Sequence, residues 1–452
     1  MRITATEWRR WILSGVGHLD SAVLPIAAAH GRTLVEDVRS RHDLPLWDNS
    51  AMDGFALHSA DIAAASEAAP VAIAVVDEVL AGSSSNPAIP PGSAVRIMTG
   101  SPVPSDADAV AQVELTAEHR AVPRPDGAAS ADGAADAAGT AAKEAGIADP
   151  PSPDTVWSAR TVRFTAPVTR GANIRRRGED TPAGSLIARS GDALTAARLS
   201  ALAAAGVAEV RVSELPRVGV LVTGAELRSP GDSLAPGQIV ESNSLLIAGL
   251  LRESGIDPVA VHHCDDDAAA VRARLDELAR DCDVIVTTGG VGPGSHDVMR
   301  LVTADNPGEP GVRAVRVAIR PGQPQCSGRL ATGAWLFALP GNPVSAAASY
   351  ELFVRPALLA MQGRTATQRP LVPAVAGAAW RGASGRLQVM PVVVDRDAPA
   401  SGALVCCPAV NPRGVSHAVG GHGAVQAYAL VGEEHGDIAA GDPVELIFVG
   451  SP

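Results

Sequence analysis

Three apolar runs that break into glycine turns constrain the fold of this chain more than any other feature. In the clearest of them, the β-branched run Val284–Val286 leads directly into Thr287-Thr288-Gly289-Gly290. Such a run is expected of a parallel strand that is buried on both faces. Glycine turns let backbone N–H groups approach an anion, and in open α/β folds they lie at the carboxyl edge of the sheet, where ligands bind. The design recurs in Val218–Gly224 and Trp335–Pro343, so the sequence predicts one shared, phosphate-tolerant pocket.

Size and charge limit the class of protein. The chain has 452 residues, enough for about three domains of roughly 150 residues each. Its net charge of −12 and its isoelectric point of about 5.4 argue against a nucleic-acid-binding surface. No run of roughly eighteen apolar residues exists, and the N-terminus has no apolar signal core, so we expect a cytoplasmic protein without membrane contact. The five cysteines have no C-x-x-C spacing, which argues against a disulfide framework and a structural zinc site.

The first half of the chain combines helical and β-rich patterns. Helices are expected over Glu7–Leu13 and over Ser21–Ala29, the second ending at Gly31. Short strands and turns between Val71 and Val113 predict a small β-rich domain. Residues 117–153 are dominated by Ala, Gly, Asp and Pro, and we interpret them as a disordered insertion in a loop of that domain.

The second half changes class twice. Strands and helices alternate between Pro216 and about Ala360, which predicts a doubly wound parallel sheet. Beyond Gln368, short strands without long helices predict a small β-barrel or sandwich. His262–Asp267 has the composition of a metal cluster, but a strand ends and a helix begins there. We therefore interpret its aspartates as caps on the helix dipole, with metal binding as the alternative.

Two polar segments carry carboxylates whose role the residues alone leave open. The segment Asp48–Asp53 is turn-prone and has carboxylates five residues apart, and its composition favours an Asx-turn in a surface loop. The segment Arg175–Asp180 packs three cations beside two carboxylates, which by itself favours a solvated, salt-bridged loop.

Several of these segments together resemble one family, the molybdopterin molybdenumtransferases, which include the MoeA and gephyrin E-domain proteins. Asp48–Ala56 reads DNSAMDGFA and is nearly the family signature DNSAMDGYA. The other matching motifs follow in the family's order and are Met98-Thr99-Gly100, Gly178-Glu179-Asp180, Gly237–Asn243, Gly289-Gly290-Val291 and Leu339–Ser345. The resemblance covers essentially the whole chain except the insertion, and its motifs are very specific.

The resemblance implies an elongated, multidomain α/β plus β protein. An N-terminal domain of helices and strands would comprise residues 1–45 and 164–215, interrupted by the β-rich domain at 46–163, which carries the 117–153 insertion. A doubly wound, MogA-like α/β domain that binds molybdopterin would follow at 216–365, and a small β-barrel at 366–452. The family also implies a homodimer whose site lies between the α/β domain of one subunit and the β-rich domain of the other.

The implied reaction is the insertion of molybdate into adenylated molybdopterin, with release of AMP and with Mg²⁺ as the metal. Carboxylates would hold Mg²⁺ or position water, glycine turns would hold phosphates, and cations would neutralise the oxyanion. The residues that would be catalytic and bind metal are Asp48, Asp53, Glu179 and Asp297. The residues that would bind the pterin nucleotide or molybdate are Asn49, Ser50, Thr99, Gly100, Thr223, Gly224, Ser242, Asn243, Gly289, Gly290, Gly294, Arg320, Gly322, Pro340, Gly341, Asn342, Pro343 and Ser416. Arg413 and His417 are weaker candidates.

The chain departs from the family pattern at several of these loops. Ala225 stands where the family motif S-T-G-D-E-L has an acid, and Gln323 stands where K-P-G-K-P has its second lysine. The family loop GGVSVGDYD becomes GGVGPGSHD, with Gly292 and Ser295 as substitutions, so only Asp297 of its acids remains. These losses leave an alternative open, a non-catalytic or altered paralogue that binds molybdopterin as carrier, sensor or scaffold. Asn342, Asp297 and Glu241 also stand where helices begin, so each could be a helix cap instead of a ligand.

Overall fold

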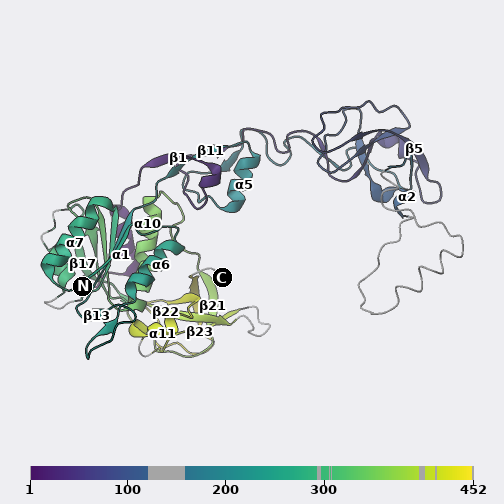
Figure 1. Ribbon diagram of the computed structural model, residues 1–452. Coiled ribbons are helices and arrows are strands. Elements are labelled where there is room, and N and C mark those ends of the chain that lie inside the picture. Colours follow the sequence, from purple (N-terminus) through teal and green to yellow (C-terminus); the bar gives the residue numbers. More distant parts are fainter. Residues whose placement is uncertain are drawn as a thin grey trace. The chain divides into compact units, whose positions relative to one another are not determined.

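The structure is a computed structural model that describes residues 2–120, 158–292, 297–304, 306, 308–395, 403–412 and 415–449. It divides into two compact units (Figure 1). The first unit comprises Met1–Val38, Ala188–Ser200 and Ala208–Pro452, and the second comprises Arg39–Ile187 and Ala201–Val207. No helix within the described residues is long and apolar enough to cross a lipid bilayer. The four-part division at residues 45, 163, 215 and 365 stays a prediction.

The first unit opens with a capped helix and a strand. In α1 (Ala5–Gly15), a capping box of Thr4 and Glu7 satisfies the first turn, and Trp8 and Ile12 are buried. The helical packing predicted for Ser21–Ala29 is wrong, because β1 (Ser21–Pro25) pairs antiparallel with β11 (Glu209–Ser213) and only the turn η1 (Ile26–Ala28) is 3₁₀-helical. Pairing with a strand about two hundred residues away in sequence overrides the local helical preference.

A six-stranded sheet forms the centre of the first unit. Its strands in spatial order are β15 (Ala260–Cys264), β12 (Val218–Thr223), β16 (Val284–Thr288), β20 (Trp335–Leu339), β19 (Pro324–Arg329) and β17 (Arg313–Arg316). The first four are parallel, as predicted, whereas β19 runs antiparallel to both neighbours. The polar sequence of β19 conceals it, because Gln325 and Ser327 are buried and hydrogen-bonded instead of apolar.

Helices cover both faces of this sheet, and alternate strand residues serve the two layers. Val284 and Val286 of β16 pack in one layer, while Ile285 between them packs in the other. The first layer contains α1, α6 (Asn243–Glu253), α9 (Pro343–Ser349), the π-helical turn η4 (Tyr350–Val354) and α10 (Arg355–Met361). The second contains α7 (Ala268–Asp281) and α8 (Val298–Thr303). Because both faces are covered, the strand ends are the edge of the sheet that can take a ligand.

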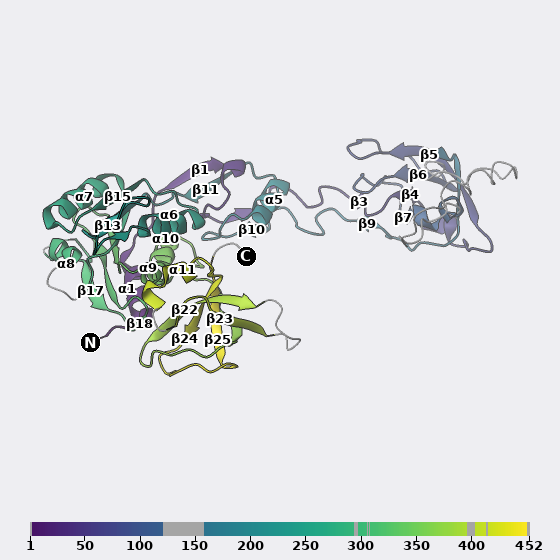
Figure 2. The ribbon, with the colours of Figure 1, turned by 60° about the horizontal axis from the view of Figure 1, so that its bottom comes forward.

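The C-terminal strands close into a barrel (Figure 2). Its strands in order are β22 (Leu387–Asp395), β23 (Leu404–Pro408), β21 (Val372–Ala376), β25 (Pro443–Phe448) and β24 (Ala427–Val431), and β24 pairs back to β22. Strand β18 (Ile319–Arg320) lies between β17 and β19 in the chain, but it pairs with β22 and so connects the α/β sheet to the barrel. The predicted small β-barrel is confirmed.

The second unit is built on a five-stranded sheet. Its strands in order are β7 (Ala109–Gln112), β4 (Gly54–Leu57), β6 (Ser93–Ile97), β5 (Val71–Val79) and β8 (Thr161–Phe164). Phe55 and Phe164 meet edge to face in its core, with ring centroids 5.7 Å apart. Of the segment 117–153, Ala117–Arg120 forms the helix α2, and the remainder lies outside the described residues, as do Gly294 and Arg413. The predicted β-rich domain is present, and disorder of the insertion stays a prediction.

Short elements complete the chain. They are β2 (Val38–Arg39), β3 (Asn49–Ser50), η2 (Ser59–Ile62), η3 (Val113–Leu115), β9 (Ile174–Arg175), β10 (Leu186–Ala188), α5 (Ala196–Ala204), β13 (Leu227–Arg228), β14 (Ile239–Val240), η5 (Val415–His417) and α11 (Val419–His422).

Candidate functional site

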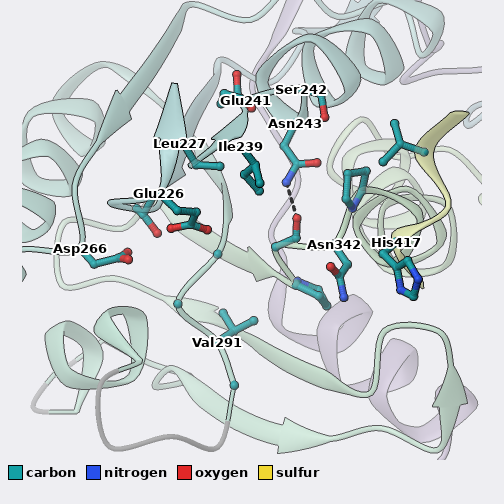
Figure 3. A pocket seen from close by; sticks show the side chains of 18 of the residues that line it. Glu226, Leu227, Ile239, Glu241, Ser242, Asn243, Asp266, Val291, Asn342 and His417 are labelled. Atoms are coloured by element: carbon teal, nitrogen blue, oxygen red, sulfur yellow. Dashed lines mark hydrogen bonds between the residues drawn. The ribbon is translucent and has the colours of Figure 1, made fainter. Parts of the chain in front are cut away.

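A cavity of ≈ 570 Å³ lies at the carboxyl ends of β12, β16 and β20 (Figure 3). Its volume is in the range of small-molecule sites, about 300–1,000 Å³. All three strand-to-glycine turns contribute to its lining, as the sequence predicts. The predicted ligand-binding residues in the lining are Thr223, Ser242, Asn243, Gly289, Gly290, Pro340, Gly341, Asn342 and Pro343, together with Asp297. Gly224 follows Thr223 in the same turn.

Gly289 lets the turns approach one another. Its φ is +99°, and a Cβ at this position would lie 2.4 Å from the carbonyl oxygen of Thr223. On its other side, the Cα of Gly289 is only 3.5 Å from an ideal Cβ built on Gly341. A side chain at Gly289 would therefore force the β12 and β16 turns apart, so glycine is a steric requirement of the cavity.

Several buried polar atoms at the strand ends have no protein partner within the described residues. They are Oγ1 of Thr223, Thr287 and Thr288, and Oδ1 of Asn243. Leaving such an atom unsatisfied costs about 1–3 kcal/mol. Thr223 and Asn243 both line the cavity, so a polar ligand there can satisfy them.

Two helices begin at the cavity. The side-chain amide of Asn243, the first residue of α6, donates to the carbonyl of Gly341 at 2.6 Å and so ties α6 to the turn before α9. Glu241 Oε1 accepts from the backbone N–H of Ser244 at 2.9 Å, so its predicted capping role is confirmed. Asn342 is the N-cap residue of α9, but capping by its side chain is wrong, since that side chain makes no cap hydrogen bond. It lies on the cavity wall beside His417 instead (Figure 3).

Asp297 is the N-cap residue of α8, and its side chain likewise makes no capping hydrogen bond. A Cβ on Gly292 would lie 3.0 Å from Asp297 Oδ2, so a side chain at this position would crowd the carboxylate. The carboxylate contributes negative charge to the cavity wall.

A second cavity of ≈ 320 Å³ adjoins the first and shares Pro324, Pro340, Asn342 and His417 with it. The predicted residues Arg320, Gly322 and Ser416 line this cavity, as does Arg386 from the start of the barrel. Burial and the neighbouring positive charge of Arg320 lower the pKa of Arg386, and its Nε is buried without a protein partner in the described structure. An anion beside these two guanidinium groups would relieve their repulsion. Arg386 thus supplies this cavity with a positive charge in place of the family's second lysine, which is Gln323 in this chain.

The remaining predicted residues lie in the second unit. Asp48 accepts from Arg176 Nη1 at 2.6 Å and from the backbone N–H of Arg177 at 2.8 Å. The Arg177 N–H and then the Arg176 guanidinium hold the pKa of Asp48 below its usual range. Glu179 accepts from the backbone N–H of Arg176 at 2.6 Å, so Asp48 and Glu179 meet at one arginine. The side chain of Asp48 therefore does not form the Asx-turn that composition favours.

Asp53 belongs to a second cluster in the same unit. Its Oδ1 accepts from the backbone N–H of Thr99 at 2.7 Å and from Thr99 Oγ1 at 2.8 Å. Gly100, with φ of +83°, donates its N–H to the carbonyl of Ser50 at 2.8 Å. Neighbouring Asn49 has a buried Oδ1 without a partner in the described structure. The structure thus brings Thr99 against Asp53 and Gly100 against Ser50, and Asn49 precedes Ser50 in the strand β3.

The carboxylates predicted to hold Mg²⁺ do not form a metal site within one chain. Among the described residues, no group of three or more His, Cys, Asp or Glu side chains could hold a metal ion. Asp48 already receives an arginine and a backbone N–H, and Asp53 and Glu179 each accept from protein donors. A metal site built on these residues needs oxygen ligands from elsewhere.

Sequence reasoning missed two carboxylates in the lining of the larger cavity, Glu226 and Asp266, which Figure 3 labels. Asp266 Oδ2 accepts from the backbone N–H of Ala225 at 3.4 Å. A carboxylate from another loop therefore lies beside Ala225, the position where the family motif has an acid. The helix cap is Asp267, which accepts from the N–H of Ala270 at 2.8 Å. The sequence signal for Asp266 was the run Asp265–Asp267, because a helix N-cap needs only one of the three aspartates and leaves the others available for a ligand.

Comparison with known proteins agrees with this arrangement. Residues 3–206 match the family described as the MoeA N-terminal region (domain I and II), and residues 219–360 match the probable molybdopterin binding domain. The molybdopterin molybdenumtransferase 2 of Mycobacterium tuberculosis is 38% identical over 378 residues, which cover 83% of this chain and 84% of the relative. The molybdopterin molybdenumtransferase of Bacillus subtilis is 32% identical over 325 residues, covering 72% and 67%.

A solved structure agrees over nearly the whole length. The molybdopterin biosynthesis MoeA protein from Pyrococcus horikoshii is similar with a TM-score of 0.70 and 26% identity, covering 99% of both chains. The order of the motifs, the fold and these relatives agree, and the chain belongs to the molybdopterin molybdenumtransferase family, the MoeA family.

Proposed function

We propose that this protein is a molybdenum insertase of molybdenum cofactor biosynthesis, which inserts molybdate into adenylated molybdopterin and releases AMP. The observation that carries the proposal is the pair of adjoining cavities at the strand ends. Glycine turns and helix starts around the larger cavity suit a phosphorylated pterin nucleotide, because they present N–H groups to phosphate oxygens. Arg320 and Arg386 in the smaller cavity suit a tetrahedral oxyanion, because two guanidinium groups can neutralise its charge.

The chain's own residues then have distinct roles. Arg320 and Arg386 hold molybdate beside the pterin and stabilise negative charge on its oxygens. Thr223 and Asn243 orient the nucleotide through side-chain atoms that lack protein partners in the described structure. The turn at Gly289 keeps the strand ends close enough for both substrates to share the site.

We infer that the active protein is a homodimer, in which the Asp48–Asp53 loop and Glu179 of one subunit meet the strand-end cavities of the other. Such an arrangement would add Asp297 of the second subunit to these carboxylates and give Mg²⁺ the oxygen ligands that it prefers. Bound Mg²⁺ would neutralise charge on the phosphate. The absence of a three-ligand group within one described chain supports a site completed by two subunits. The expected cytoplasmic location is part of the same proposal.

The test is AMP release by the full-length protein from adenylated molybdopterin, with molybdate and Mg²⁺. We expect release by the wild type, strong loss in Arg320→Gln, and no change in Arg272→Gln, which removes the same charge from an exposed position on α7. Binding of molybdopterin without AMP release would contradict the insertase and favour the carrier, sensor or scaffold. Absence of both would mean that the fold serves another purpose.

A further inference from the structure

A third cavity, of ≈ 390 Å³, lies in the first unit and shares no lining residue with the two substrate cavities. We call it the arginine pocket, after the residues His30, Arg32, Arg252, Arg355, Arg364 and Arg369 in its lining. They come from three places: the loop after η1, the end of α6, and α10 with the segment that follows it. Five guanidinium groups on one cavity require compensating negative charge.

Carboxylates compensate only part of this charge. Glu351 Oε1 bridges two of the arginines, Arg369 Nε at 2.9 Å and Arg355 Nη1 at 3.5 Å. Arg252 pairs with the exposed Asp257 at 3.1 Å. Glu253 also lines the pocket, and Glu214 acts on Arg32 through space. These four carboxylates face five arginines, and one of them is shared between two.

Arg364 and Arg32 bond mainly to neutral groups. Arg364 donates to Thr33 Oγ1 at 3.0 Å and to the carbonyl of Gly31 at 2.5 Å. Arg32 donates through Nη2 to the carbonyl of Ser213 at 2.7 Å, while its Nε is buried without a partner in the described structure. Each guanidinium has five N–H donors, so these hydrogen bonds use only some of the donors of Arg364 and Arg32.

The like charges in the pocket act on one another. Burial and the neighbouring Arg355 lower the pKa of Arg364, and burial and Arg369 lower that of Arg355. An anion among them would replace repulsion with charge-assisted hydrogen bonds.

We propose that the arginine pocket binds a tetrahedral oxyanion of the phosphate and molybdate class, at a site separate from the substrate cavities. The fork of a guanidinium matches the edge of such an ion, and the buried Nε of Arg32 is a donor that only a ligand or water would satisfy. The cavity exceeds the size of one oxyanion, so the same groups can hold the phosphate of a larger ester.

The experiment is calorimetric titration of the full-length protein with inorganic phosphate and, separately, with molybdate, at constant ionic strength in chloride. We expect saturable binding of at least one ion, weakened roughly tenfold or more in Arg364→Gln because a charge-assisted contact is lost. Arg32→Lys keeps the charge but removes the Nε donor, and we expect it to weaken the same binding. Arg272→Gln is the charge-matched control and should bind as the wild type does.

The variant Arg320→Gln distinguishes binding in the arginine pocket from binding in the substrate cavities. If the arginine pocket binds the ion, the heat of binding to this pocket persists in Arg320→Gln, whereas Arg364→Gln weakens that binding as stated above. Phosphate binding alone identifies a phosphate site, and molybdate binding alone identifies a second site for the substrate ion; both support the proposal. Binding of neither ion, equal binding by wild type and both pocket variants, or loss of all saturable binding in Arg320→Gln overturns it. Circular dichroism shows whether each variant is folded, and Arg32→Lys keeps the test valid if Arg364→Gln is not.

Discussion

Replacing Gly289 by alanine is the sharpest test of how the strand-end cavity is built. The new Cβ would lie 2.4 Å from the carbonyl oxygen of Thr223 and 2.9 Å from its Oγ1, where ordinary contact begins at 3.4 Å. The turn must therefore move by about 1 Å to accommodate one methyl group. The φ of +99° is also unfavourable for an L-residue with a side chain. Backbone strain of about 1–3 kcal/mol and overpacking of about 1–3 kcal/mol together predict a loss of about 2–6 kcal/mol in unfolding free energy.

The effect on catalysis should exceed the effect on folding. A displacement of about 1 Å in a substrate-positioning element can reduce a rate roughly a hundredfold. We expect Gly289→Ala to release AMP about a hundredfold more slowly under conditions where it is still folded. The measurements are thermal and urea unfolding by circular dichroism, and AMP release under single-turnover conditions.

Gly249→Ala is the matched control. Gly249 lies within α6, has an ordinary φ, and an added Cβ would meet no atom within 4 Å. Alanine there should stabilise the protein by about 0.5–1 kcal/mol through helix propensity and leave AMP release unchanged. If Gly289→Ala matched the wild type in stability and in rate, the steric account of the cavity would be refuted.

Further predictions concern charge, pH and metal. Arg386→Gln should lower AMP release roughly ten- to hundredfold, with partial rescue in Arg386→Lys, because lysine restores the charge without the fork; unchanged release would remove Arg386 from the site. The depressed pKa of Asp48 means that its contacts stabilise the fold above the ordinary Asp pKa of about 3.9 and are lost as pH falls through the lower folded value. The melting temperature of the wild type should therefore exceed that of Asp48→Asn at neutral pH, and the difference should shrink in acid; a constant difference contradicts this. Removing divalent metal with a chelator should abolish AMP release. The melting temperature of the protein should stay nearly unchanged, since no three-ligand group among the described residues of one chain could hold a structural metal. AMP release that persists without metal would exclude the Mg²⁺ proposal.

Where local signals were strong, the sequence predicted the structure well. The apolar run Val284–Val286, followed by threonines and glycines, is buried on both faces and ends at the cavity. The run specifies a strand because only a strand covered on both sides buries consecutive β-branched residues, and the glycines specify where it turns. The barrel followed from strands too closely spaced to have helices between them.

Where contacts are distant, the sequence misled. Ser21–Pro25 has a composition compatible with a helix, and only its pairing with Glu209–Ser213 makes it a strand. Asn342 stands where a helix begins, yet its side chain faces the cavity because the backbone alone forms the helix start. Arg386 stands in no motif that indicates a ligand, and only the placement of the barrel brings it to a cavity. Asp266 stands in a run of aspartates that we interpreted as helix caps, and only the placement of the loops shows that it lines the larger cavity.

The sequence by itself determined the class of each region, the family, and the three turns that converge on one cavity. These are properties of periodicity and of residues with special backbone freedom, which act over a few neighbours. Tertiary structure alone decided which side chains complete the cavities, which carboxylates are taken up by arginines, and that five arginines surround a third cavity. Charge compensation depends on distances through space between residues far apart in the chain, and no local pattern records those distances.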